Sequence, residues 1–331
     1  MVEKINKNIS LSFILKFLYV SVLILIIFLI LYFLYIIYLE MPLNPENLEV
    51  ILVNNSQTGN QTSQLQFFLN MKFNHNNISF LINPDCGQEK ETRLLKAFEL
   101  ISEQIEIINF FQVYESPDIE IICSENKNSE FEENKDYFIA GEGGAREIIK
   151  SGDYNVITDG VVFLYKYPFK TSDCNIPVVE VHEILHVFGF DHSSNKDSLM
   201  NPLISSCKQK LDSSIVLELK KLYSLDNLAD LKIEDLRVVK KGRYIDFNIT
   251  IKNSGVLDAE NVNLTIFDDG DVIDDRQLGE IKFGAGMTIK VVNLKLANRN
   301  PQKIEFIVDR ANNNKEFDKN NNIAEIKIND I

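Results

Sequence analysis

The sequence predicts an α+β domain with a mixed, twisted sheet, followed by an all-β sandwich, behind one N-terminal transmembrane helix. Three observations predict this order. An uninterrupted apolar run occupies residues 17–39, helical and strand-like apolar patterns alternate through residues 77–225, and only strand-like patterns fill residues 229–331. A chain of 331 residues that is 45% hydrophobic is longer than one ordinary domain.

Charge limits the class of partner. The formal net charge is −14, and no basic patch stands out. A surface that follows a phosphate backbone would be basic, so we expect no nucleic-acid partner.

The apolar run of residues 17–39 contains no charged residue and would span about 34 Å as a helix, enough to cross a bilayer. Lys4, Lys7 and Lys16 precede it, and glutamates follow it. This asymmetry predicts a cytoplasmic tail (residues 1–16), an anchor in the cell membrane and an extracellular remainder, in a single-pass arrangement. A cleaved signal peptide is the alternative, but YLEMPLNPE lacks a small-residue cleavage site.

Residues 40–76 form a juxtamembrane segment rich in Asn, Gln and Ser, with one strand-like run at residues 48–53. This segment could be a stalk or could add a strand to a sheet, and the sequence leaves both interpretations open.

The α+β part begins with a strand at residues 78–82 and a helix from residue 85 to about 108. One stripe of that helix is apolar and reads as core: Leu94, Phe98, Ile101 and Ile105. Further strands are expected at residues 110–114, 119–123, 137–140 and 161–166, with a Gly-rich bend at residues 141–144. Asp212 is expected to cap a last helix through its side chain.

Five residues between these elements follow the order H-E-x-x-H-x-x-G-x-x-H: His182, Glu183, His186, Gly189 and His192. On a helix, His182 and His186 lie one turn apart on one face, so both rings can bind one ion. Gly189 can take positive φ and return the chain, which lets His192 supply a third nitrogen. Three protein ligands with one open position are typical of a catalytic zinc site. A solvated helix with scattered histidines is the alternative, but three of the four histidines fall in this motif.

The run HEILHVFGFDHSSNKDSLMNP resembles the signature of the metzincin zinc peptidases, in particular the matrixins. The resemblance implies a zinc endopeptidase with one catalytic Zn²⁺ on His182, His186 and His192. Glu183 would then be the base, and Met200 would lie in the family's "Met-turn" beneath the ion without binding it. Asn201 and Ile204 stand where matrixins usually carry Tyr, so the substrate preference does not carry over.

The order of elements over residues 77–225 is also similar to that of metzincin catalytic domains. The resemblance implies that the first and third strands are parallel neighbours. It also implies that an extended peptide or protein substrate pairs with an edge strand within residues 143–157.

All four cysteines lie in this domain, and an even number outside the cell favours two disulfides among three connectivities. The resemblance implies Cys86–Cys123, at the ends of neighbouring strands, and Cys174–Cys207, around the metal motif. Four free thiols are the alternative. A second alternative is that Cys86 is an inhibitory cysteine similar to that of matrixin propeptides.

The alternating patterns after residue 229 predict strands at residues 231–239, 245–251, 262–267, 287–294 and 304–308. KNSGVLDAENVNLTIFDDG resembles the Ig-like domains related to bacterial cell-adhesion modules, which implies a spacer or a module that binds a surface ligand. An acidic cluster fits either structural Ca²⁺ or, preferably, a solvated turn: Asp268, Asp269, Asp271, Asp274 and Asp275.

Together these features predict a membrane-anchored, outward-facing zinc endopeptidase whose sandwich is dispensable for chemistry. The alternative is a surface adhesion protein with a vestigial peptidase-like domain. Glu183 favours the enzyme, because a purely structural metal site has no use for that carboxylate.

Overall fold

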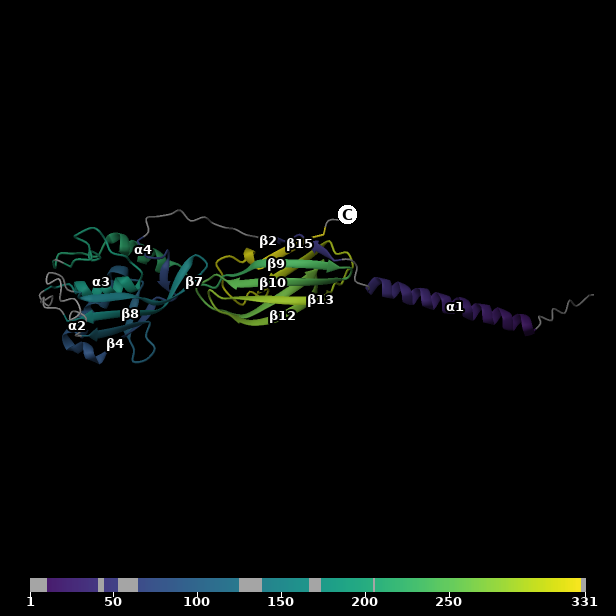
Figure 1. Ribbon diagram of the computed structural model, residues 1–331, viewed down its shortest axis with the longest axis horizontal. Coiled ribbons are helices and arrows are strands. Elements are labelled where there is room, and N and C mark those ends of the chain that lie inside the picture. The colour runs from purple at the N-terminus through teal and green to yellow at the C-terminus, as the bar shows by residue number, and fades with distance from the viewer. Residues whose placement is uncertain are drawn as a thin grey trace, which may run out of the picture.

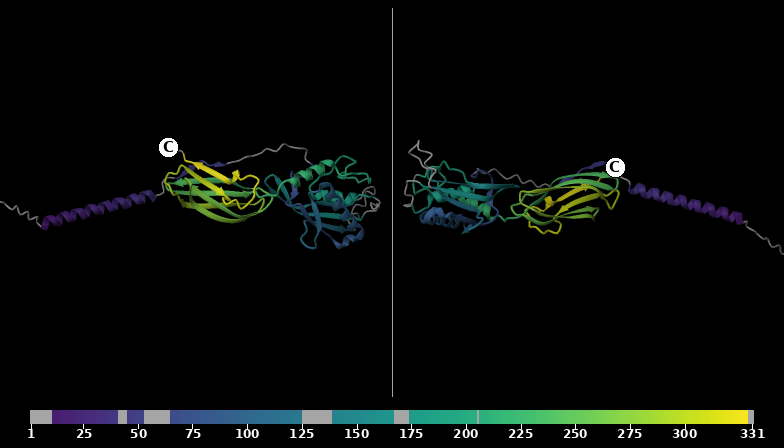
Figure 2. Two further views of the ribbon diagram at one scale, coloured as in Figure 1. Left: turned by 180° about the vertical axis from the view of Figure 1, so that it is seen from behind. Right: turned by 60° about the horizontal axis from the view of Figure 1, so that its bottom comes forward.

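A computed structural model describes residues 11–40, 45–52, 65–124, 139–166, 174–204 and 206–328. Figure 1 shows that an isolated helix, a β-sandwich and an α/β domain follow one another along the long axis. The two further views in Figure 2 agree that the sandwich lies between the helix and the α/β domain.

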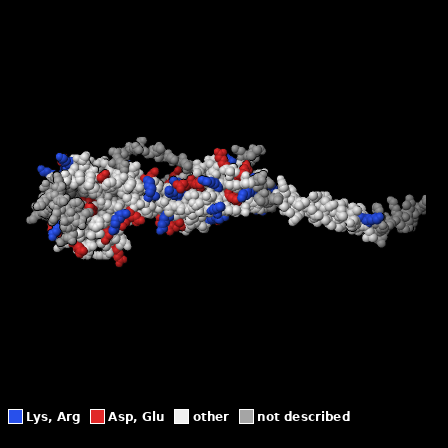
Figure 3. Space-filling model, viewed as in Figure 1, with Lys and Arg blue, Asp and Glu red and all other residues white. Residues whose placement is uncertain are grey.

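Helix α1 (Leu11–Glu40) is the isolated helix. Its segment Leu15–Tyr38 has a mean hydropathy of 3.1 and is exposed along its length, which fits a membrane anchor or a signal sequence. Figure 3 shows an uncharged surface along it apart from basic atoms near its start. Near its end, Arg299 Nη1 donates to the carbonyl oxygen of Tyr38 at 2.9 Å. Lys4 and Lys7 of the expected tail lie outside the described residues.

Short strands from residues 40–76 join both domains. β1 (Glu46–Leu48) pairs with β9 (Leu231–Lys241), and β2 (Ile51–Leu52) pairs with β15 (Ile323–Lys327), so both belong to the sandwich. β3 (Met71–Phe73) instead pairs with β8 (Tyr154–Tyr165) of the α/β sheet. The α/β domain is therefore inserted between the second and third strands of the sandwich. Val53 of the expected strand lies outside the described residues.

The α/β sheet has the order β3-β8-β6-β4-β5, and β7 pairs with β8 as an antiparallel edge. Its remaining strands are β4 (Asn77–Ile82), β5 (Asn109–Gln112), β6 (Ile119–Ser124) and β7 (Gly141–Ser151). The first and third expected strands, β4 and β6, are parallel neighbours as the resemblance implied.

Two sequence predictions are wrong at the start of β7. Ile139 and Ala140 are not in a strand, and Tyr137 of that expected strand lies outside the described residues. Residues 141–144 are not a bend, because Gly141 pairs with Leu164 and opens the β7–β8 ladder. At Gly141 and Gly143, α3 (Val178–Val187) packs so closely on β7 that a side chain would not fit.

The other helices of the domain are α2 (Gly87–Ile105) and α4 (Ser213–Ser224). The predicted stripe of α2 is buried throughout, so its role as core is confirmed. Phe98 of this stripe stacks on Phe80 of β4 with ring centroids 4.1 Å apart. The disulfides are Cys86–Cys123 and Cys174–Cys207, the pairing that the resemblance implied. Cys86 therefore offers no free thiol for an inhibitory role.

The sandwich packs the sheet β1-β9-β10-β13 against the sheet β12-β11-β14-β15-β2. Its other strands are β10 (Tyr244–Asn253), β11 (Ala259–Asp268), β12 (Asp271–Ile281), β13 (Gly286–Lys295) and β14 (Lys303–Val308). The inner faces bury alternate apolar residues, as in Phe247 against Phe306 at 5.2 Å.

The solvated-turn prediction for the acidic cluster holds only at Asp269 and Gly270. Asp271, Asp274 and Asp275 lie in strand β12, which the sequence analysis missed. Asp268 is fully buried and accepts a hydrogen bond from the Asn298 amide, while Asp269 accepts from backbone amides of the next loop. These two carboxylates therefore hold the segment of residues 298–303 in place. No described contact of the cluster indicates a calcium site.

Candidate metal centre

Helix α3 is the element that carries the first two histidines. Every one of its residues is buried, which its nearly continuous apolar sequence VVEVHEILHV favours. The helix ends where Gly189 adopts φ +86°. A side chain at this glycine would begin 2.3 Å from Met71 Sδ, so only glycine fits. The chain then turns back and brings His192 to the helix.

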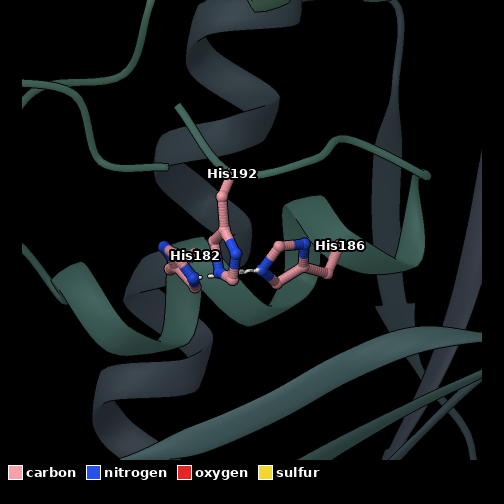
Figure 4. A group of neighbouring side chains, drawn as sticks. All are labelled: His182, His186 and His192. Carbon is pink, nitrogen blue, oxygen red and sulfur yellow. Dashed lines mark hydrogen bonds between the residues drawn. The ribbon is translucent and has the colours of Figure 1, made fainter. Parts of the chain in front are cut away.

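The three predicted histidines converge on one point, as Figure 4 shows. His186 Nε2 lies 3.0 Å from His182 Nε2 and 3.2 Å from His192 Nε2. Tetrahedral zinc with nitrogen ligands at about 2.0–2.1 Å would separate such atoms by roughly 3.3 Å. The spacing of the ring nitrogens therefore fits one zinc ion.

The protonation of the rings supports the same fit. His182 Nδ1 contacts the carbonyl oxygen of Leu199 at 2.6 Å, and His186 Nδ1 contacts that of Phe190 at 2.7 Å. A carbonyl only accepts, so each Nδ1 carries the proton and each Nε2 presents a lone pair. Lone pairs that face each other at 3.0 Å repel unless a cation lies between them.

Burial keeps these two rings neutral, which is the form that binds a metal. Burial is the main cause that lowers the pKa of His182 to about 4, against the raising effect of the Leu199 carbonyl. Burial also lowers the pKa of His186. Both rings are therefore ready to bind a cation at neutral pH without losing a proton.

Glu183 is a residue of α3 that packs against the start of β7, and it is only 5% exposed. A side chain at Gly141 would begin 2.6 Å from Glu183 Cγ, and one at Gly143 would begin 1.9 Å from the Glu183 carbonyl oxygen. Burial chiefly raises the pKa of Glu183 to about 8, and Glu142 adds to this rise while the Gly143 amide opposes it. A cation on the adjacent histidines would favour the ionised carboxylate again.

Gly141 and Gly143 belong to the candidate site because they allow β7 to approach Glu183, whereas the sequence analysis assigned them to a bend. The available signal was their alternation in Gly141-Glu142-Gly143. In a strand, this places both glycines on one face and lets another backbone approach.

The turn at residues 198–200 contacts the first histidine through the carbonyl oxygen of Leu199. Met200 is fully buried, and its amide donates to Ser198 Oγ at 2.9 Å. Ser198 Oγ donates in turn to Asp212 Oδ2. Asp212 does occupy the N-cap position of α4, but its side chain makes no capping bond, so that prediction is wrong. Its carboxylate is used by the turn instead.

A segment before β3 borders the site on another side. The Phe67 amide donates to the Gly189 carbonyl at 2.8 Å, and the Phe67 ring stacks 6.2 Å from the ring of His186. Gln66 is buried and donates to the carbonyls of Met71 and Phe188. No motif in the sequence pointed to these contacts, because they arise only when residues 65–67 meet the loop after α3.

A buried ion pair fixes α3 against α2. Arg93 Nε lies 2.8 Å from Glu180 Oε1, and their side chains are 13% and 3% exposed. A second bond joins Arg93 Nη2 to Glu180 Oε2 at 3.1 Å. This paired geometry holds the first turn of the helix that presents the histidines.

The turn residues that differ from the matrixin pattern have local roles. Asn201 Nδ2 donates to the carbonyls of Ser193 and Asn195, and Asn201 Oδ1 accepts from the Leu203 amide. Ile204 packs partly buried against the core. Asn201 therefore stabilises the loop after His192.

Comparison with known proteins divides the chain in two. Residues 72–224 match the Matrixin family, and residues 228–326 match the CARDB family. No curated protein matches the chain. A crystal structure of a CARDB domain from Pyrococcus furiosus, in complex with di-metal ions, matches 31% of this chain and 90% of that chain, with 14% identity and a TM-score of 0.26.

Proposed function

We propose that the matrixin domain of this chain is a zinc-dependent endopeptidase that is anchored in the cell membrane and faces outward. The observation that carries the proposal is the convergence of three histidine Nε2 atoms, with two of the rings held in the metal-binding tautomer by backbone carbonyls. The matrixin match supports the same chemistry.

His182, His186 and His192 would hold one zinc ion, which leaves a coordination position open for water or a substrate oxygen. When bound, zinc supplies an acidified water and polarises the carbonyl of the scissile peptide. Glu183 would accept a proton from the attacking water and pass it to the departing amine. Its burial beside Gly141 and Gly143 fixes the carboxylate and shields it from bulk water.

The peptide substrate would lie along β7. This strand pairs with β8 on one side, and no other described strand pairs with its outer edge. An extended peptide can add to such an edge through main-chain hydrogen bonds, which are indifferent to side-chain identity.

The strand order supports a spacer role for the sandwich. Glu46, soon after α1, pairs with Lys240 near one end of β9, whereas the matrixin domain precedes Leu231 at the other end. An eleven-residue strand is about 35 Å long, so the sandwich would separate the matrixin domain from the membrane surface by about that distance. Binding of a surface ligand by the sandwich is the second role that its CARDB match favours.

Proteolysis by the detergent-solubilised full-length chain tests the proposal. We expect cleavage of an unfolded protein, its loss after a zinc chelator, and its recovery when zinc is restored. A zinc-loaded, folded chain that cleaves neither unfolded protein nor peptide would contradict the proposal and favour an adhesion protein with a vestigial peptidase domain.

A further inference from the structure

The β7–β8 hairpin (residues 149–155) of the matrixin domain packs against the end of the sandwich. Ser151 is fully buried, and its Oγ donates to the carbonyl oxygen of Gly255 and lies 3.4 Å from that of Asn253. The ring of Tyr154 stacks on Phe317 of the sandwich with centroids 5.8 Å apart. The two domains therefore share a specific contact in addition to their covalent connections.

Two glycines allow the backbones to approach at this contact. Gly152 has φ +53°, and a side chain there would begin 2.3 Å from the Ser254 carbonyl oxygen. On the sandwich side, Gly284 has φ +72°, and a side chain would begin 2.7 Å from Ile149 Cγ2 and 2.9 Å from the Lys150 carbonyl oxygen. Each domain thus omits a side chain where the other's backbone lies.

The sandwich side of the contact is held in place by Asn253. This buried amide donates to the carbonyls of Leu257 and Ile281 and accepts from the amides of Asp230 and Gly255. With all these partners fixed, residues 253–255 offer the hairpin a preformed surface.

The same strand reaches the metal centre at its other end. The β7–β8 ladder runs from Ser151, paired with Tyr154, to Gly141, paired with Leu164, with two register shifts between Ala145 and Ile148. Gly141 and Gly143 pack on Glu183, as described above. As an edge strand, β7 is held by β8 along its length, by α3 at its start and by the sandwich at its end.

We propose that the sandwich is a positioning element of the active site, which acts by holding the β7–β8 hairpin. The proposal rests on the proposed function, because β7 is the strand that would bind substrate and fix Glu183. It replaces the expectation that the sandwich is dispensable for chemistry. Ser151, Gly152 and Gly284 are then positioning residues and do not touch substrate.

Substitution of Gly284 by Ala tests the proposal from the sandwich side, without any change in the matrixin domain. Gly270→Ala is the matched control, because Gly270 also has positive φ, +95°, but has no atom within 4 Å of the added side chain. Both substitutions impose similar backbone strain in the sandwich. Only Gly284→Ala pushes against the hairpin. Full-length variants are compared for zinc content, thermal unfolding, peptide kinetics and amide hydrogen exchange.

We expect Gly284→Ala to speed exchange of the β7 amides and to lower kcat/KM by about tenfold, with zinc content and thermal midpoint equal to those of Gly270→Ala. Unchanged hydrogen-exchange rates of the β7 amides would show that the sandwich does not hold the hairpin, whatever the peptidase activity. Faster exchange with unchanged kcat/KM would overturn the positioning role. A wild-type chain without peptidase activity would instead overturn the proposed function, while the exchange data would still decide whether the sandwich holds β7.

Discussion

His182 and Leu199 are joined by a hydrogen bond of 2.6 Å between the ring Nδ1 and the main-chain carbonyl oxygen. This bond links α3 to the turn at residues 198–200 and sets which nitrogen of the ring is free. The buried methionine of the turn, Met200, directly follows the residue whose carbonyl orients the ring of His182. A displacement of the turn would therefore also move the ring of His182.

Removal of the hydroxyl that braces this turn is expected to weaken zinc binding. In Ser198→Ala, Met200 loses an acceptor for its amide and Asp212 loses its donor, so the Leu199 carbonyl is less well fixed. Groups that orient a ligand typically contribute 10-fold to 100-fold to metal affinity, and we expect about tenfold here. Competition with a chelating dye measures it. Ser206→Ala, on the exposed part of the same loop, is the control, and equal zinc affinity in both variants would contradict this role.

Alanine at Gly143 is expected to disturb both stability and turnover. The added carbon would lie 1.9 Å from the Glu183 carbonyl oxygen, so β7 and α3 must separate. Overpacking of this kind costs about 1–3 kcal/mol of unfolding free energy. Gly144→Ala, one residue further with open space around it, should unfold near the wild-type temperature. Thermal unfolding and peptide turnover of the two variants provide the comparison, and equal behaviour would show that β7 does not pack on α3 as described.

The buried ion pair at α3 is expected to matter far more than an exposed one. Arg93→Met leaves the buried Glu180 carboxylate without its partner, which should cost about 3–5 kcal/mol. Arg146→Met breaks a pair with Glu120 and Asp159 whose side chains are 41%, 31% and 33% exposed, and should cost about 1 kcal/mol or less. Chemical denaturation of both variants tests the contrast. A loss in Arg93→Met no larger than in Arg146→Met would be inconsistent with a buried pair.

The stability of the sandwich should fall as pH rises from about 4.5 to above 7. Burial is the main cause that raises the pKa of Glu316 from 4.5 to about 7. Between these values the folded state binds more protons than the unfolded state, so the unfolding free energy decreases with pH. Glu316→Gln, which keeps an acceptor for Leu231 or Asn322, should remove much of this slope. Calorimetry of the sandwich transition at several pH values provides the measurement, and identical slopes in both proteins would refute the assignment.

The convergence of the three histidines could be predicted from the sequence because their spacing is local. His182 and His186 are one helical turn apart, and the positive φ of Gly189 follows from its lack of a side chain. Period and composition likewise predicted the stripe of α2 and five of the sandwich strands. These signals depend on neighbours along the chain and need no knowledge of tertiary contacts.

The missed features depend on contacts between distant residues. β12 carries mixed charges on largely exposed faces, so its sequence shows no apolar alternation. β1 is too short to show a pattern and pairs with the edge of β9. β2 lies within the strand-like run at residues 48–53, but its pairing with β15 could not be read from the run alone. The Asp212 carboxylate accepts from Ser198 instead of making its expected capping bond. The contact between the hairpin and the sandwich joins residues about 100 positions apart.

The most direct test of the account is a paired measurement of zinc content and peptide turnover on full-length wild type, Glu183→Gln and His186→Ala. The account predicts one zinc per chain in wild type and in Glu183→Gln, with kcat/KM lower by about 10²-fold to 10⁴-fold in Glu183→Gln. His186→Ala should lose both zinc and activity. Wild-type turnover in Glu183→Gln, or full zinc content in His186→Ala, would contradict the assignment of a catalytic zinc centre.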